Sequence, residues 1–388
     1  MGTFASQLRA ELDSLAAADR LRACRPLQGP DRARPTVAAS GRALISFSSN
    51  DYLGLANHPS LAAAALEAAQ KQGFGASASR LVTGDLPAHR DLESGLAAFL
   101  DRPAALVFPS GYQANLGALT ALAGPADLIV SDALNHASLI DGCRLSRARV
   151  EVFPHRDAAA ARDLLARGPA RRRLLVTESL FSMDGDAAPL ADLAAAARAA
   201  DAVLVVDEAH ALGAVGPAGR GLCAAAGVVP DVLVGTLGKA FGASGGFVAG
   251  DGVLREVLVN RARTFVFTTA LPPPVAAAAL AALHLISGPE GDARRGRLTE
   301  NAALLAAQLT SATLIQAPPA GPILPIILGT EARALATSEA LLKRGIFAPA
   351  IRPPTVPAGS ARLRVTLSAA HSLGEVAALA QALVQVLQ

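Results

Sequence analysis

The sequence predicts an α/β fold with a large domain on a mostly parallel sheet, a smaller C-terminal α+β domain and an N-terminal helical arm. In residues 59–251, short apolar runs alternate with Ala- and Leu-rich helical segments, and the composition changes after Pro272. Apolar strands separated by helices indicate a sheet that is buried on both faces. We expect the arm at residues 1–45, the large domain at 46–270 and the C-terminal domain at 271–388.

The elements follow from local patterns, beginning with the arm. Apolar residues recur at helical spacing between charges, which predicts an amphipathic helix over residues 4–23. Short apolar runs predict strands at residues 43–48, 105–108, 128–131, 150–153, 174–177, 202–206, 232–235 and 246–249. After Pro272 we expect strands at 323–328 and 361–367 and helices at 331–343 and 373–387. The apolar run 275–286 is shorter than the ~18 residues of a membrane span and predicts a buried helix.

Composition excludes several classes of protein. With 52% hydrophobic and 17% charged residues, the chain does not resemble a disordered protein. A net charge of +3 and the absence of Trp give no sign of a nucleic-acid partner. No run is apolar enough for a membrane span, and a chain this long needs no metal to hold a core. Three cysteines without a CxxC pair fit a reducing cytoplasm.

Chemically useful side chains follow the predicted strands. Ligands of open α/β sheets bind at the carboxyl ends of the strands, so these positions are the candidate site. Asp207 and His210 follow strand 202–206, where a carboxylate could bind a ligand's ring nitrogen and the imidazole could reach the ring's edge. The alternative is a helix-capping Asp and a surface His.

A lysine follows strand 232–235 and precedes a glycine-rich loop. Lys239 would be poorly solvated there, which disfavours its charged form, and a neutral amine can form a Schiff base with an aldehyde. The alternative is a surface lysine. The only other lysines are Lys71 and Lys343, and the chain uses Arg for every other cation. Because Arg cannot be deprotonated in a protein, the choice of Lys favours the Schiff-base role.

The remaining strand ends carry groups that suit a phosphorylated aromatic ligand. Gly111 and Tyr112 open a helix after strand 105–108, and a helix N-terminus binds phosphate. His136 could stack on a ring, although a loop His is also compatible with simple solvation. Ser182 could bond a ring hydroxyl. Together with Lys239, these groups predict a pyridoxal phosphate (PLP) site.

Several motifs carry a family resemblance over nearly the whole chain. They are 49–55 (SNDYLGL), 75–80 (GASASR), 135–138 (NHAS), 207–210 (DEAH), 236–239 (TLGK) and 351–364 (IRPPTVPAGSARLR). The sequence resembles the α-oxoamine synthases of the fold-type I PLP-dependent transferases. It is most similar to the branch that forms 8-amino-7-oxononanoate in biotin biosynthesis, and segment 351–364 most separates that branch from its relatives.

The resemblance implies an acyltransferase that condenses L-alanine with pimeloyl-CoA or pimeloyl-acyl carrier protein, releasing CO2 and a free thiol. It also implies a cytoplasmic homodimer with shared active sites and no nucleic-acid or membrane partner. The identity of the acyl carrier stays open. One alternative is a sister enzyme such as 2-amino-3-ketobutyrate ligase, against which segment 351–357 argues. Another is a non-catalytic PLP-binding sensor module, which would require an additional DNA-binding domain.

The resemblance also implies residue roles. Lys239 would hold the cofactor as a Schiff base, and the other catalytic residues are His136, Asp207 and His210. The remaining residues that would contact the cofactor are Gly111, Tyr112 and Thr236 at the phosphate and Ser182 at the ring oxygen. Thr268 would contact the phosphate bound by the partner subunit. The residues that would bind the substrates are His136, Arg22, Asn50, Arg352 and Thr355, with Arg25 as the alternative to Arg22. Among these, Arg352 would bind the amino acid carboxylate.

Overall fold

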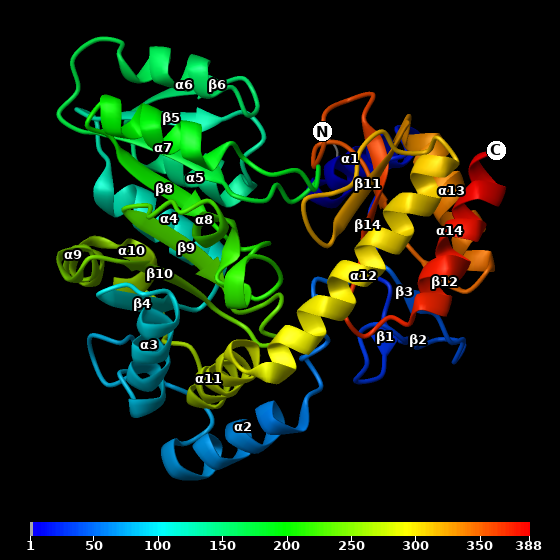
Figure 1. The fold of residues 1–388 in the computed structure, drawn as a ribbon, viewed down its shortest axis with the longest axis horizontal. Helices are drawn as coiled ribbons and strands as arrows, with labels where there is room; N and C mark the ends of the chain where they lie inside the picture. Colours follow the sequence, from blue (N-terminus) through cyan, green and yellow to red (C-terminus); the bar gives the residue numbers. More distant parts are fainter. Residues whose placement is uncertain (1–2) are drawn as a thin grey trace. The chain divides into compact units, whose positions relative to one another are not determined.

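The computed structural model describes residues 3–388, which form two compact units (Figure 1). The larger unit contains residues 50–182 and 186–298. The smaller unit contains the described residues up to Ser49, together with 183–185 and 299–388. The predicted boundaries between the arm, the large domain and the C-terminal domain, after residues 45 and 270, remain predictions. Among residues 3–388, no helix combines the length and apolar character that a membrane crossing requires.

A seven-stranded sheet forms the centre of the larger unit. Its spatial order is β4 (Ala104–Phe108), β10 (Gly246–Gly250), β9 (Val232–Thr236), β8 (Val203–Asp207), β7 (Arg173–Glu178), β5 (Leu128–Asp132) and β6 (Arg149–Phe153). The predicted strands of the large domain are all present, so the predicted α/β class is confirmed. Neighbouring strands from β9 to β6 run parallel, as a buried sheet with helical crossovers requires.

Only the direction of β10 departs from the parallel arrangement of the sheet. β10 pairs antiparallel with both β9 and β4. Residues 237–245 connect β9 to β10, whereas a parallel crossover needs about a dozen residues or more. The short connection therefore returns the chain directly, with Gly246 opposite Thr236.

Helices cover both faces of the sheet. Residues of α4 (Gly111–Leu122), α5 (Ala137–Leu145), α9 (Gly252–Arg261) and α10 (Arg263–Val266) share one apolar cluster with the strands. Residues of α6 (Ala158–Leu165), α7 (Leu190–Ala199) and α8 (Gly221–Ala225) share another. A third group packs together at α2 (Pro59–Gln72), α3 (Pro87–Phe99) and α11 (Pro273–Ser287). The apolar run 275–286 is therefore a buried helix, as predicted.

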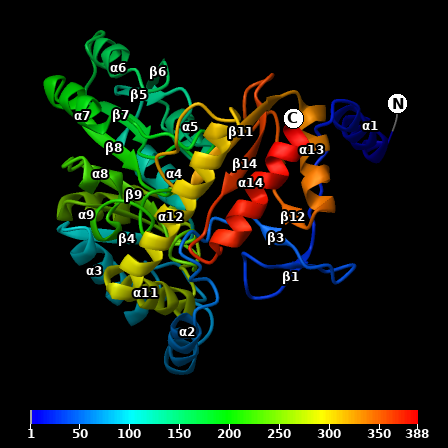
Figure 2. The ribbon, with the colours of Figure 1, turned by 45° about the vertical axis from the view of Figure 1, so that its right-hand side comes forward.

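The smaller unit has its own sheets. β11 (Ile323–Gly329), β14 (Ala361–Thr366) and β13 (Ala350–Ile351) form one antiparallel sheet. The short pairs are β12 (Ile346–Phe347) with β3 (Ile45–Ser46), and β1 (Leu27–Gln28) with β2 (Thr36–Val37). Helix α13 (Glu331–Lys343) packs on β11, β14 and α14 (Leu373–Leu387), and Figure 2 shows α13 and α14 near β14. The boundary between the units falls within α12 (Pro289–Ser311).

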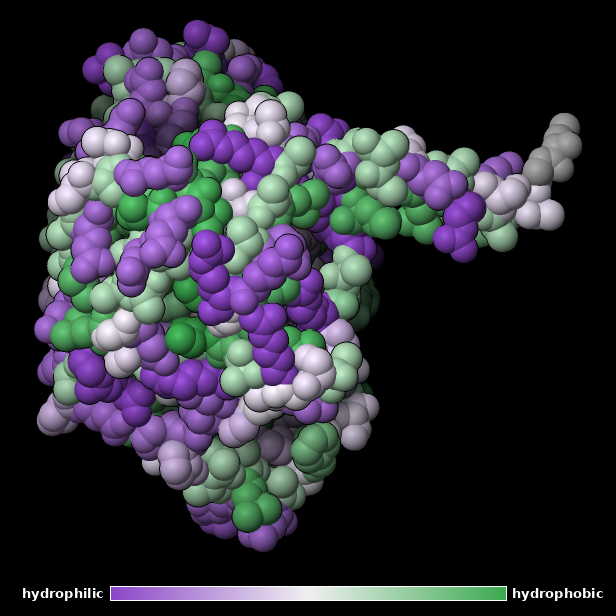
Figure 3. Space-filling model, turned by 90° about the vertical axis from the view of Figure 1, so that its right-hand side faces the viewer, coloured by the Kyte–Doolittle hydropathy of each residue, from purple (hydrophilic) through white to green (hydrophobic). Residues whose placement is uncertain are grey.

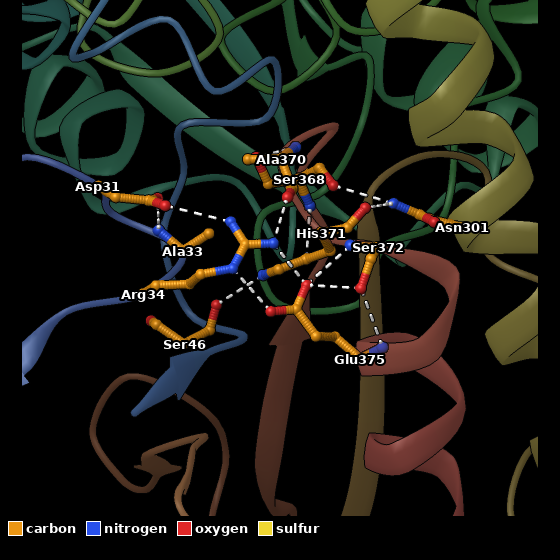
Figure 4. A network of polar contacts seen from close by, with 10 residues as sticks. All are labelled: Asp31, Ala33, Arg34, Ser46, Asn301, Ser368, Ala370, His371, Ser372 and Glu375. Carbon is orange, nitrogen blue, oxygen red and sulfur yellow. Dashed lines mark hydrogen bonds and ion pairs between the residues drawn. The ribbon is translucent and has the colours of Figure 1, made fainter. Parts of the chain in front are cut away.

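Charged and polar side chains tie the N-terminal segment of the smaller unit to its C-terminal end (Figure 4). The Arg34 guanidinium donates to both carboxylate oxygens of Glu375, at 2.7 and 2.6 Å. Glu375 also accepts from the backbone N–H of Ser372 at 2.8 Å, closing a capping box on α14. His371 Nε2 lies 2.9 Å from the carbonyl oxygen of Ser46. Residues 31–46 are thereby fixed against the start of α14.

Helix α1 (Phe4–Ala17) confirms the predicted helix of the arm but ends earlier than residue 23. Asp19 adopts a left-handed backbone with φ of 56°, and the amide N–H of Arg20 bonds back to the Leu15 carbonyl at 2.8 Å. The Arg20 side chain then pairs with Glu331 at 2.8 Å, which holds the following residues extended along the smaller unit. Apolar side chains on α1 stay exposed, as Figure 3 shows, and Phe4 is 74% exposed.

Candidate active site

The carboxyl ends of the central strands surround a pocket of about 160 Å³ in the larger unit. It is lined by Gly111, Tyr112, Asn115, His136, Ser138, Glu178, Asp207, Ala209, His210, Val234, Gly235, Thr236 and Lys239. Residues from five strand ends contribute, although they are far apart in the sequence. The pocket brings together seven of the predicted site residues: Gly111, Tyr112, His136, Asp207, His210, Thr236 and Lys239.

The lysine side chain meets a histidine inside this pocket. Lys239 Nζ lies 2.7 Å from His210 Nε2, and His210 Nδ1 lies 2.6 Å from the Tyr52 hydroxyl. That hydroxyl donates to Asn50 Oδ1 at 3.1 Å. Because the hydroxyl carries one proton, it accepts from Nδ1–H of His210 in this arrangement, and Nε2 presents its lone pair to Lys239. Tyr52 is fully buried and holds the imidazole in place.

Asp207 ends β8 with its carboxylate bound by two donors. The Asn115 side-chain amide donates to Oδ2 at 2.6 Å, and the backbone N–H of Ala209 donates to Oδ1 at 2.8 Å. The same amide nitrogen donates to the Ser138 hydroxyl at 2.9 Å. Asp207 is 5% exposed, so these bonds orient a carboxylate that is largely buried.

His136 caps α5 and lies in the pocket wall. Its Nδ1 accepts from the backbone N–H of Ser138 at 3.2 Å, which leaves the proton of the neutral imidazole on Nε2. Burial lowers the pKa of His136, while the charge of Asp207 opposes that shift. A neutral imidazole with a fixed ring orientation suits stacking on an aromatic ligand.

The N-terminus of α4 forms an anion seat. Ser110 Oγ caps the helix by accepting from the backbone N–H of Gln113 at 3.2 Å. The N–H groups of Gly111 and Tyr112 lie in the first turn, where an α-helix leaves them without an intrahelical partner. Thr236 lies beside them, since a Cβ on Gly111 would lie 3.3 Å from Thr236 Oγ1.

Glu208, which does not line the pocket, binds the first turn of α8. This carboxyl group is fully buried and accepts from Ser179 Oγ at 2.9 Å and from the backbone N–H groups of Leu222 and Cys223 at 3.1 and 2.5 Å. Burial raises its pKa, and these donors oppose the rise. Glu208 therefore supports the chain between Asp207 and His210 without lining the pocket.

Three predicted residues of the larger unit lie outside the pocket lining. Ser182 is buried after β7 and is 6% exposed. Thr268 lies beside α4, where its hydroxyl is 3.5 Å from the side-chain amide of Gln113. Asn50 is connected to the pocket through Tyr52, whose hydroxyl donates a hydrogen bond to Asn50 Oδ1. Their predicted contacts with cofactor and substrate stay predictions.

The other predicted substrate residues meet in the smaller unit. Arg22 Nη2 donates to the Arg352 carbonyl and to the Thr355 hydroxyl, both at 3.3 Å. Arg352 in turn donates to the Leu21 carbonyl at 3.2 Å. The alternative residue, Arg25, lies instead over the Phe347 ring at 5.9 Å. Arg22, Arg352 and Thr355 thus form one cluster. In this structure the Arg352 guanidinium donates to backbone carbonyls of the arm, so these N–H groups are not available to a substrate carboxylate.

Sequence reasoning did not single out four residues that shape the site: Tyr52, Asn115, Ser138 and Glu178. Asn115 lies one turn into α4, four residues after Gly111, so helical spacing could have placed it on the same face. Ser138 follows His136 at a helix start, where a hydroxyl is common. No local signal links Tyr52 to His210, since the two residues are distant in sequence.

The pocket fits pyridoxal phosphate. It offers an amine for the aldehyde, a helix N-terminus for the phosphate, a bound carboxylate for the ring nitrogen and an imidazole for the ring face. Two buried polar atoms on its lining residues, Asn115 Oδ1 and Glu178 Oε1, have no hydrogen-bond partner within residues 3–388. Buried polar atoms are normally paired, so a polar ligand in the pocket accounts for them.

Comparison with known proteins agrees with this geometry. Residues 42–383 match the model of the aminotransferase class I and II family. The chain belongs to this family. It is 53% identical over 380 residues to 8-amino-7-oxononanoate synthase of Anaeromyxobacter dehalogenans, covering 97% of this chain and 94% of that one.

Solved structures extend the likeness to the whole fold. Serine palmitoyltransferase of S. paucimobilis, solved with a bound PLP–myriocin aldimine, superposes with a TM-score of 0.92 at 30% identity, covering 99% of this chain and 98% of that chain. An 8-amino-7-oxononanoate synthase of Francisella tularensis gives a TM-score of 0.77 at 28% identity, covering 89% and 98%. The predicted fold-type I architecture and the predicted resemblance are therefore confirmed.

Proposed function

We propose that this protein is a PLP-dependent acyltransferase that condenses L-alanine with a pimeloyl thioester to give 8-amino-7-oxononanoate. The similarity to synthases of that name supports the substrates. The observation that carries the chemistry is the Lys239 amine, 2.7 Å from His210 Nε2 in the pocket that also contains Asp207. A carboxylate, an imidazole and an amine around one cavity are what PLP chemistry requires of a protein.

Three residues of the pocket have defined tasks in this proposal. PLP, when bound, withdraws electrons from the α-carbon of the amino acid. Lys239 would hold the aldehyde of the cofactor through Nζ, and as a free amine it would take the proton from the α-carbon. Asp207 would hold the proton of the ring nitrogen. His136 would pack on the ring and orient the substrate.

The proposed reaction balances in atoms and charge. The α-carbon of alanine loses its proton and forms a bond to the thioester carbonyl carbon, and the thiolate leaves and takes up a proton. The former alanine carboxylate departs as CO2, and a proton returns to the same carbon. Lys239 is the group placed to remove and to return these protons. Arg352 is proposed to bind the carboxylate, and Thr355 and Arg22 the acyl substrate.

The assembly and the location of the enzyme are part of the proposal. We infer a cytoplasmic homodimer in which Thr268 contacts the phosphate bound by the partner subunit. Thr268 is half-buried beside α4, close to the anion seat of its own chain. The three thiols are free, two of them buried, which is compatible with a reducing compartment. Either coenzyme A or acyl carrier protein could present the pimeloyl group.

The test is product identification with purified protein loaded with PLP. We expect alanine and a pimeloyl thioester to give 8-amino-7-oxononanoate by mass spectrometry, and supplying pimeloyl-CoA and pimeloyl-acyl carrier protein in parallel identifies the carrier. Rapid product from glycine and acetyl-CoA instead would assign the chain to 2-amino-3-ketobutyrate ligase. Tight PLP binding without turnover of either pair would favour the sensor module.

A further inference from the structure

Glu178 faces the same pocket and has no assigned role. It is the last residue of β7, lies beside Asp207 in the register of the parallel pair β7–β8, and lines the cavity. The side chain is only 2% exposed, and its Oε1 atom has no hydrogen-bond partner among residues 3–388. A carboxyl oxygen buried in this way at a ligand pocket requires a physical account.

Two neighbouring buried carboxyl groups cannot both carry a charge without a large cost in free energy. Asp207 has two strong donors, from Asn115 and Ala209, which stabilise its ionised form. Glu178 accepts from the backbone N–H groups of His136 and Ser182, but among residues 3–388 no side-chain amide donates to it as Asn115 donates to Asp207. The two acids are thus unequal, and the proton belongs on Glu178.

The electrostatic surroundings of Glu178 agree with this assignment. Burial, followed by the charge of Asp207, raises the pKa of Glu178 to about 8, while Lys239 and the backbone N–H groups of His136 and Ser182 oppose the rise. Four further titratable side chains line the pocket, namely Tyr112, His136, His210 and Lys239. Asp132, at the end of the adjacent strand β5, contacts His155 at 2.9 Å. Glu178 is therefore neutral at pH 7.

We propose that Glu178 is a positioning residue of the cofactor pocket, a neutral carboxyl group that leaves Asp207 as the single negative charge among the pocket-lining side chains. The inference rests on the proposed PLP function. A neutral Glu178 supplies a hydrogen-bond donor next to the bound carboxylate, where an ionised one would repel a ligand that carries a phosphate. Cofactor binding and the proton on Glu178 are then coupled.

Coupling predicts a specific pH dependence of cofactor affinity. PLP is titrated into cofactor-free protein between pH 6.5 and 9.5 by absorbance, for the native protein and for Glu178→Gln, which is isosteric with the neutral acid. The ratio of the native Kd to the variant Kd should be near one at pH 6.5 and rise to about tenfold by pH 9, since each pH unit above the pKa costs up to a factor of ten.

Two outcomes would overturn the inference. One is a ratio that stays constant with pH, which includes a loss of affinity in Glu178→Gln that is equal at every pH, as a purely structural role would give. The other is a ratio that falls as pH rises. Failure of both proteins to bind PLP at any pH would contradict the proposed function as well, so the two failures are distinguishable.

A matched control is available in the same fold. Glu208 is also fully buried but has three donors and does not line the pocket. Glu208→Gln should lower the melting temperature and leave the pH dependence of the Kd unchanged. Should Glu178→Gln not fold, infrared spectra of the native cofactor-free protein decide the point. We expect a carboxylic acid C=O band at pH 7 that declines by pH 9, and its absence at pH 7 would overturn the inference.

Discussion

Replacing His155 with Gln tests how the larger unit holds the segment that follows β7. His155 Nδ1 lies 2.9 Å from Asp132 Oδ1, and Nε2 lies 3.0 Å from Asp186 Oδ2. Its ring packs edge-on against Phe181 at a centroid distance of 4.3 Å. Burial alone would lower its pKa, but the hydrogen bonds and charges of the two carboxylates raise the pKa of His155 to about 9. The protonated imidazole therefore bridges the two acids at neutral pH.

The size and sign of the effect follow from this pKa. A rise from the ordinary value near 6.5 to about 9 corresponds to about 3 kcal/mol of unfolding free energy. The side chain is 22% exposed, so solvent screening reduces this to about 1–2 kcal/mol. Because the folded-state pKa is raised, the stabilisation is fully present below pH 6.5 and disappears as pH rises through 9.

The assay is the free energy of unfolding in urea for the native protein and His155→Gln at pH 6, 7.5 and 9.5. We expect the native protein to exceed the variant by about 1–2 kcal/mol more at pH 6 than at pH 9.5. As a control, Asp186→Asn removes one of the two carboxylates and should reduce the same pH dependence. A difference that is constant with pH, or larger at pH 9.5, would refute the ion-bridge account of His155.

Two further substitutions test the geometry of the pocket. Tyr52→Phe removes the hydroxyl that lies 2.6 Å from His210 Nδ1, and we expect kcat/KM to fall about fivefold with little change in melting temperature, since one buried hydrogen bond contributes about 1 kcal/mol. An unchanged kcat/KM would contradict the role given to Tyr52. Gly246→Ala places a Cβ 2.5 Å from the backbone nitrogen of Gly111, and we expect cofactor-free protein to bind PLP at least about tenfold more weakly because the anion seat is displaced. Native-like PLP affinity in Gly246→Ala would show that the helix N-terminus does not seat the phosphate.

Strand-end chemistry was the part of the site that the sequence could predict. Asp207 directly follows one short apolar run and Lys239 lies four residues after another, and parallel strands of a covered sheet end at one edge. Order along the chain is therefore enough to place them at one pocket. The same argument identified Gly111 and His136, and the short apolar runs themselves predicted every strand of the central sheet.

Contacts between distant segments could not be read from local pattern. Tyr52 reaches His210 only because the chain before α2 folds beside β8, and no spacing encodes that approach. From the sequence, Glu178 is only a polar residue at the end of a predicted strand. Its role depends on its position beside Asp207 of β8 in the sheet. The pairing of Arg20, just after α1, with Glu331 joins two segments that are 311 residues apart in the sequence. The direction of β10 was accessible from the shortness of its connection.

The most direct measurement is the identity of the residue that becomes joined to the cofactor. Protein incubated with PLP is reduced with borohydride, digested and mapped by mass spectrometry. We expect one modified peptide, with the pyridoxyl group on Lys239, and none in a Lys239→Arg variant, which keeps the positive charge but has no amine that can react. Modification of Lys71 or Lys343 in place of Lys239, or no stable adduct at all, would contradict the assignment of this pocket.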